Sequence, residues 1–204
     1  MTIDEAKTTR APEVSRVLNF IGMLIFLGIL FGAWQYQFST QSLPCTLCLL
    51  QRIAFLGVAF GCGMNLMLGP KARHYGVILV SAAFGIAVSL RQTFLHINPY
   101  FDVSTGTPTL DPTTNPPFGP PSLGLALYVW GIIIFLCVFL GAGLILMWEQ
   151  QFVPYETEPK WLVQLAFYGV LFLALVAAAE VLFTFEECGP YACPDDGSWD
   201  WWLF

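Results

Sequence analysis

The chain has 204 residues, of which 56% are hydrophobic and only 11% are charged. A soluble domain is about 25% charged, so the composition excludes an ordinary soluble domain and predicts an integral protein of the lipid bilayer. The formal net charge of −6 argues against a nucleic-acid partner, because nucleic-acid-binding domains carry basic patches.

Five apolar runs follow a polar lead-in at residues 1–16, which we expect to be flexible. Each run is long enough to cross about 30 Å of hydrocarbon as a helix. The runs cover residues 17–36, 44–68, 75–97, 123–148 and 161–185. A polar link at residues 37–43 joins the first two runs. The predicted fold class is therefore an all-α integral membrane protein, with a bundle of four transmembrane helices over residues 17–148 and a fifth transmembrane helix at 161–185.

Basic residues predict how the chain is oriented, because Lys and Arg collect on the cytoplasmic side of a membrane. Of the eight Lys and Arg, those outside the spans all lie on the side of the N-terminus: Lys7, Arg10, Arg16, Lys71, Arg73 and Lys160. The N-terminus is therefore predicted inside and the C-terminus outside. The loop at 149–160 is then cytoplasmic, and the loop at 98–122 and the tail at 186–204 are external.

The six cysteines fall into two close pairs and two single residues. Cys45 and Cys48 open the second span, and Cys188 and Cys193 lie just beyond the fifth. The predicted orientation places both pairs at the outer face, where disulfides persist. The single residues Cys62 and Cys137 lie within spans, where a cysteine usually packs as a small apolar side chain.

Cys45 and Cys48 share the first turn of a predicted helix, with Pro44 at a favourable first position. The helix dipole and the free N–H groups at that end lower the pKa of a thiol and favour the reactive thiolate. The alternative is an inert disulfide, but closing so small a loop gives little stability. The pair is therefore interpreted as redox-active.

A buried cation follows the pair, because Arg52 lies four residues after Cys48 and about 12 Å below the helix start. A charge at that depth is costly and indicates function. Arg52 is predicted to donate to a quinone carbonyl, with a purely structural ion pair as the alternative. Glu180 in the fifth span could pair with Arg52 or with Arg91, and such a structural pair is favoured over proton transfer.

Further candidates follow Arg91 along the third span, where Gln92 and His96 complete a polar group near its outer end. His96 is a candidate for binding a quinone oxygen or moving protons, with an ordinary surface histidine as the alternative. No metal site is predicted, because His74 and His96 have no ligand-like spacing to the cysteines.

The tail pair is set in an acidic, Trp-rich stretch that suits the membrane interface. Asp195 and Asp196 raise the pKa of neighbouring thiols and disfavour thiolates. Cys188 and Cys193 are either a structural disulfide or part of a catalytic relay, and the relay is the preferred reading.

These residues resemble the disulfide-bond formation protein B (DsbB) family. The matching stretches are Pro44-Cys45-Thr46-Leu47-Cys48 with Arg52, the run from Arg91 to Pro99, and Ser122-Leu123-Gly124-Leu125 leading into Trp130. The resemblance implies a four-helix bundle in the bacterial inner membrane. It also implies oxidation of a periplasmic, thioredoxin-like dithiol protein of the DsbA type, with electrons passing to ubiquinone or menaquinone from the membrane pool. By this analogy Cys48 faces the quinone, Cys45 exchanges with the second pair, and Arg52 binds the quinone. Arg91, Gln92 and His96 are the further residues that we expect to bind the quinone.

The chain departs from the family in two places. A histidine often stands where this chain has Gln92, and the external loop at 98–122 lacks the usual second cysteine pair. The fifth span instead brings Cys188 and Cys193 to the outer face, and we hypothesise that they replace the missing pair. Thiol–disulfide exchange requires only access and suitable thiolates, so sequence order is no obstacle.

Two other functions remain open at this point. One is a quinone reductase similar to vitamin K epoxide reductase, although its Cys-x-x-Cys would not be expected to open the second span. The other is a non-enzymatic membrane assembly protein that holds metal with its four external cysteines.

Overall fold

The computed structural model describes residues 3–40, 46–97, 101–102, 107–108, 125–147 and 160–188. The helices are α1 (Ile3–Thr40), α2 (Thr46–Leu68), α3 (Ala72–Ile97), α4 (Leu127–Leu146) and α5 (Lys160–Cys188). Two-residue strands β1 (Phe101–Asp102) and β2 (Thr107–Pro108) pair antiparallel, with Phe101 opposite Pro108.

All five helices contain a stretch long and apolar enough to cross a membrane. A helix satisfies its backbone hydrogen bonds internally, and it must do so in a membrane because lipid tails offer no hydrogen-bond partners. Large apolar side chains such as Val80, Phe94 and Leu144 are exposed on the outside of the bundle, where a bilayer would cover them. The predicted all-α membrane fold with a fifth span is confirmed.

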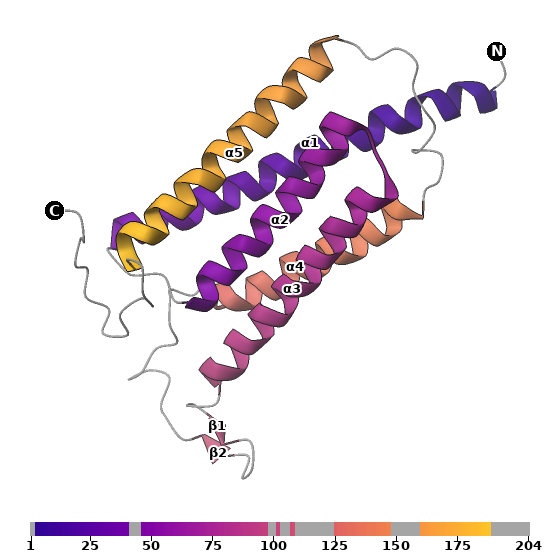
Figure 1. The fold of residues 1–204 in the computed structure, drawn as a ribbon. Helices are drawn as coiled ribbons and strands as arrows, with labels where there is room; N and C mark the ends of the chain where they lie inside the picture. Colours follow the sequence, from indigo (N-terminus) through magenta and orange to yellow (C-terminus); the bar gives the residue numbers. More distant parts are fainter. Residues whose placement is uncertain are drawn as a thin grey trace.

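Helix α2 is central, with α1 and α5 on one side and α3 and α4 on the other (Figure 1). Phe55 of α2 stacks on Phe26 of α1 and on Phe135 of α4, with ring centroids 5.8 and 4.4 Å apart. On another face of α2, a Cβ added at Gly63 would lie 3.2 Å from Val170 of α5. The residues of α2 therefore contact both halves of the bundle.

Successive helices run in opposite directions, so the start of α2 lies at the same end of the bundle as the ends of α1, α3 and α5 (Figure 1). The other end holds the turn between α2 and α3, where Gly69 adopts a φ of 77°, a value that glycine tolerates without steric cost. The Arg16 guanidinium reaches this turn, 3.7 Å from the position of a Cβ on Gly69. Arg16 and the neighbouring Lys71 therefore lie at one end, as the clustering of basic residues predicts.

A buried hydrogen-bond network joins three helices near that basic end. Asn19 of α1 donates to the Tyr75 hydroxyl of α3 over 2.9 Å, and Asn65 of α2 donates to Asn19 Oδ1 over 2.9 Å. Asn65 Oδ1 in turn accepts from the backbone N–H of Lys71 and lies 3.1 Å from His74 Nδ1. The network anchors the α2–α3 turn to α1.

Two predictions about the first span are wrong. Helix α1 begins at Ile3, so most of the expected flexible lead-in is helical. It ends at Thr40, so Gln37 is not in a polar link but in the last turns of α1, where its side chain is 3% exposed. A bundle partner for the polar Gln37 side chain explains the difference, because hydropathy alone ends a span at its first polar residues. Pro44, the expected first helical residue of the second span, lies outside the described residues.

Candidate functional site

Cys48 lies in the first turn of α2, at the end of the bundle where α1, α3 and α5 terminate (Figure 1). Its side chain is half-buried, and its sulfur is in a disulfide bond with a cysteine whose side chain the structure does not describe. Cys62 and Cys137 are free thiols, so neither is that partner.

One polar cluster joins Cys48 to α3. Gln92 donates from Nε2 to Cys48 Sγ over 3.5 Å, and its Oε1 accepts from Gln51 Nε2 over 2.9 Å. Gln51 also donates to the Ser89 hydroxyl over 3.0 Å. Helix α4 closes over this cluster at Gly131, where a Cβ would lie 2.9 Å from Ser89 Oγ. The sulfur therefore lies beside a part-buried chain of amide and hydroxyl groups.

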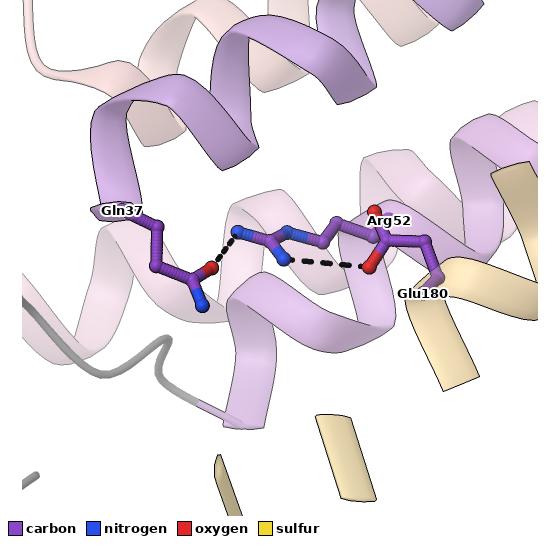
Figure 2. A network of polar contacts seen from close by, with 3 residues as sticks. All are labelled: Gln37, Arg52 and Glu180. Atoms are coloured by element: carbon purple, nitrogen blue, oxygen red, sulfur yellow. Dashed lines mark hydrogen bonds and ion pairs between the residues drawn. The ribbon is translucent and has the colours of Figure 1, made fainter. Parts of the chain in front are cut away.

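A second polar cluster forms around Arg52 on the opposite side of α2. Figure 2 shows the guanidinium between Gln37 of α1 and Glu180 of α5. Arg52 NH2 donates to Gln37 Oε1 over 2.5 Å, and NH1 lies 3.4 Å from Glu180 Oε2 as an ion pair. Arg52 is 9% exposed and Glu180 is 5% exposed, so each charge offsets part of the cost of burying the other.

The adjacent residues Gln51 and Arg52 thus contact different helices. Gln51 reaches toward α3 and α4, whereas Arg52 reaches toward α1 and α5. Successive residues of an α-helix point about 100° apart, which is why the two can diverge. Cys48 lies about one turn before both of them, so each side of α2 carries one polar cluster within about one turn of Cys48.

The predicted site residues fall into three groups. Cys48 and Gln92 are in contact. Arg52 pairs with Glu180, which decides between the two ion pairs considered for Glu180. Arg91 is exposed on α3 and takes no part in that pair.

For the remaining predicted residues, the structure describes either the backbone alone or nothing. Cys45 and Cys193 are outside the described residues. Cys188 is the last residue of α5 and His96 lies in the last turn of α3, but their side chains are not described. Helix α5 therefore ends, at Cys188, on the same end of the bundle where α2 begins (Figure 1).

Sequence reasoning missed Gln37, Gln51 and Ser89. Each is a polar residue in or next to an apolar run, near the end that carries Cys48, and that clustering was a usable signal. The predicted packing role of Cys62 is confirmed, since its side chain is 6% exposed, whereas Cys137 lies exposed on α4. Within the described part of the chain, no group of three or more His, Cys, Asp or Glu side chains is placed to hold a metal ion.

Comparison with known proteins gives consistent matches over the first four spans. The model of the family described as "Disulfide bond formation protein DsbB" matches residues 15–145. "Disulfide bond formation protein B 1" of Pseudomonas putida is 30% identical over 152 residues, covering 64% of this chain and 88% of that protein. "Disulfide bond formation protein B" of Burkholderia thailandensis is 30% identical over 145 residues, covering 60% of this chain and 83% of that protein. The search of solved structures finds no match.

Proposed function

The chain belongs to the disulfide bond formation protein DsbB family, and from that membership we propose that it is a membrane protein-dithiol:quinone oxidoreductase. It is a multi-pass membrane protein of disulfide-bond formation. The proposed reaction oxidises a periplasmic, thioredoxin-like dithiol protein of the DsbA type and reduces ubiquinone or menaquinone. The proposed location is the bacterial inner membrane, with the N-terminus inside and the redox cysteines facing the periplasm.

The observation that supports this proposal most directly is the environment of Cys48. Its sulfur is already in a disulfide, so it can accept electrons from an incoming thiolate. A donor from Gln92 lies 3.5 Å from the sulfur, and hydrogen bonding to a thiolate stabilises it. The position in the first turn of α2 adds the field of the helix N-terminus. A sulfur in this setting is a good leaving group in thiol–disulfide exchange.

The proposed relay consists of two exchanges and one quinone reduction. The partner's two thiols reduce a Cys188–Cys193 disulfide and leave as a disulfide. The two tail thiols then reduce a Cys45–Cys48 disulfide in the same way. The two thiols of Cys45 and Cys48 finally become a disulfide again, and their two electrons and two protons convert the quinone to a quinol. No other oxidant is required.

Each quinone-binding residue has a proposed role. Arg52 donates a hydrogen bond to a quinone oxygen and stabilises the negative charge that develops there. Gln92 lies beside Cys48 and donates to the same ring. Arg91 and His96, from the outer end of α3, complete the set proposed to bind the quinone.

The relay is tested by replacing the tail pair. Cys188→Ser/Cys193→Ser should lower the rate at which the protein oxidises its dithiol partner at least a hundredfold, because exchange through the tail is removed. Reduction of ubiquinone by a small dithiol such as dithiothreitol should continue, since that reagent can reach Cys45–Cys48 directly. The matched control is Cys62→Ala/Cys137→Ala, which removes the two free thiols and should leave both rates unchanged.

A wild-type rate of partner oxidation in the tail variant would show that the relay is wrong. Absence of thiol-dependent ubiquinol formation by the unaltered protein would instead contradict the oxidoreductase proposal as a whole. Stoichiometric bound metal without quinone in the purified protein would favour the metal-binding alternative.

A further inference from the structure

Glu180 belongs to a part of the chain that the family match does not cover. The match ends at residue 145 and α5 begins at Lys160. Yet the carboxylate of Glu180 lies 3.4 Å from Arg52, a residue of the matched region four positions beyond Cys48. The fifth helix therefore contributes a charged partner to Arg52, which lies about one helical turn beyond Cys48.

The contact leaves Glu180 only half satisfied. Oε2 faces Arg52 NH1, whereas Oε1 is buried and has no hydrogen-bond partner within the described part of the chain. A carboxylate can accept up to about four hydrogen bonds, and a buried oxygen without one is costly enough to call for an explanation. A ligand that brings an O–H or N–H donor would satisfy it.

Arg52 is held from two sides but retains further donors. Its NH1 and NH2 each use one N–H in the contacts with Glu180 and Gln37, and a guanidinium carries five N–H groups in total. The remaining donors and the open Glu180 oxygen lie on neighbouring groups. The pair therefore offers both unused donors and an unused acceptor. A quinone ring oxygen needs both, because it accepts a hydrogen bond as a carbonyl and can also donate one as a hydroxyl.

We propose that Glu180 of α5 completes the quinone site, by positioning the Arg52 guanidinium and by accepting a hydrogen bond at Oε1 from the hydroxyl of the reduced ring. This inference rests on the proposed function. Before reduction the ring oxygen is a carbonyl that accepts from Arg52. After the two thiols have given up two electrons and two protons, the same oxygen is a hydroxyl that can also donate to Glu180. In this proposal Glu180 acts only as a hydrogen-bond acceptor and contributes no proton to the reaction.

The proposal predicts that Glu180 distinguishes quinol from quinone. Glu180→Gln replaces one carboxylate oxygen by an NH2 group, which donates and cannot accept. It also removes the negative charge beside Arg52, which makes the cation more attractive to a carbonyl oxygen. The affinity for ubiquinol-1 should therefore fall about 10- to 100-fold, the size expected for one hydrogen bond to a charged group. The affinity for ubiquinone-1 should be unchanged or should rise.

The experiment measures equilibrium binding of ubiquinone-1 and ubiquinol-1 to the full chain in detergent micelles. The Kd values come from quenching of tryptophan fluorescence, and KM and kcat for ubiquinone-1 are measured alongside. Glu180→Asp, which retains the charge and both oxygens, should restore most of the quinol preference. If Glu180→Gln does not fold, Glu180→Asp is compared with the unaltered protein instead, and its shorter side chain should weaken quinol binding more than quinone binding.

Leu173→Ala is the matched structural control. Leu173 lies seven residues before Glu180 on α5, is buried, and packs at Gly63 of α2, so its truncation loosens α5 without changing a charge. It should lower the unfolding temperature and leave the ratio of quinol to quinone affinity at the wild-type value.

Two results would overturn the inference. The first is a ratio of quinol to quinone affinity in Glu180→Gln that equals the wild-type ratio. The second is a change of this ratio in Leu173→Ala as large as that in Glu180→Gln, because the effect would then come from packing and not from the carboxylate. In either case the unaltered protein still reduces ubiquinone, so the proposed function stands. If the unaltered protein neither binds nor reduces ubiquinone-1, the proposed function fails and this inference fails with it.

Discussion

Arg52 carries a full charge at a position that is 9% exposed, and its charged partner Glu180 is buried as well. Removing one member of a buried ion pair typically costs about 3–5 kcal/mol, because the other charge remains without compensation. Replacing both members by apolar residues of similar size is often close to neutral. The stability of the bundle should therefore respond to the balance of charge at this site more than to the presence of either residue.

Arg52→Met should lower the free energy of unfolding by about 3–5 kcal/mol, because Glu180 is left alone. Arg52→Met/Glu180→Leu should recover most of that loss. The measurement is unfolding by sodium dodecyl sulfate in mixed micelles, followed by circular dichroism. A double variant less stable than Arg52→Met would contradict the ion-pair argument.

Gln92 is the residue whose amide contacts the sulfur of Cys48. Gln92→Leu should slow oxidation of the dithiol partner about 10- to 100-fold, since a hydrogen bond to a charged group contributes about 1.5–3 kcal/mol. Stopped-flow measurement of the exchange step gives the rate. The control is Thr93→Val, which removes a hydroxyl bonded to Ser89 O of its own helix and should have little effect. Equal slowing in the two variants would argue against a role for the contact with sulfur.

Sequence reasoning identified Cys48, Arg52 and Gln92 because polar, charged or reactive side chains are uncommon in an apolar span and usually indicate a function there. It could not divide their contacts between the two sides of α2. That division depends on the rotation of α2 about its axis and on which helix approaches each side, and hydropathy reports neither. For the same reason it left open whether Glu180 pairs with Arg52 or Arg91.

The helices of this bundle approach closely at glycines. Gly85 of α3 lies against the buried ring of Phe135, where an added Cβ would be 2.5 Å from two ring carbons. Phe135 cannot easily move away, because it is buried and its ring also stacks on Phe55. The contact between α3 and α4 therefore requires the absence of a side chain at this position.

Gly85→Ala should lower the free energy of unfolding by about 1–3 kcal/mol, the usual cost of overpacking a filled core. Gly76→Ala provides a control in the same helix, since nothing lies within 4 Å of its Cβ position. That change should be neutral or should stabilise by up to about 1 kcal/mol through helix propensity. Thermal unfolding in detergent compares the two, and an equal loss in both would exclude a specific role for the Phe135 contact.

The positions of the five spans were predictable because a run of about 20 apolar residues has few alternatives to a membrane helix. Their ends were less so. Gln37 is polar in sequence but is held inside the bundle by Arg52, so α1 continues past the point where hydropathy falls. The central place of α2 was not predictable either, because residues that face lipid and residues that face other helices are equally apolar.

Arg16 and Lys71 lie at one end of the bundle and Cys48 lies at the other, and this separation supports the proposed orientation, with the N-terminus inside. In a background with Cys45, Cys48, Cys188 and Cys193 changed to serine, Lys71→Cys should be protected from a membrane-impermeant maleimide in intact cells. Thr114→Cys in the loop at 98–122 should be labelled under the same conditions. Mass-tagged gel shifts report the labelling, and the reverse pattern would place Cys48 on the cytoplasmic side.

The contact between Arg52 and Glu180 spans 128 positions of the chain, which bears on how the protein is made. A ribosome adds about 5–20 residues per second, so Arg52 is synthesised about 6–26 s before its counter-ion exists. During that interval Gln37, which precedes Arg52 by 15 positions, is already available as a hydrogen-bond partner, but the charge is uncompensated. Arg52 therefore gains its charged partner only after the last helix has been made, so the second helix cannot reach its final environment before α5 is in place.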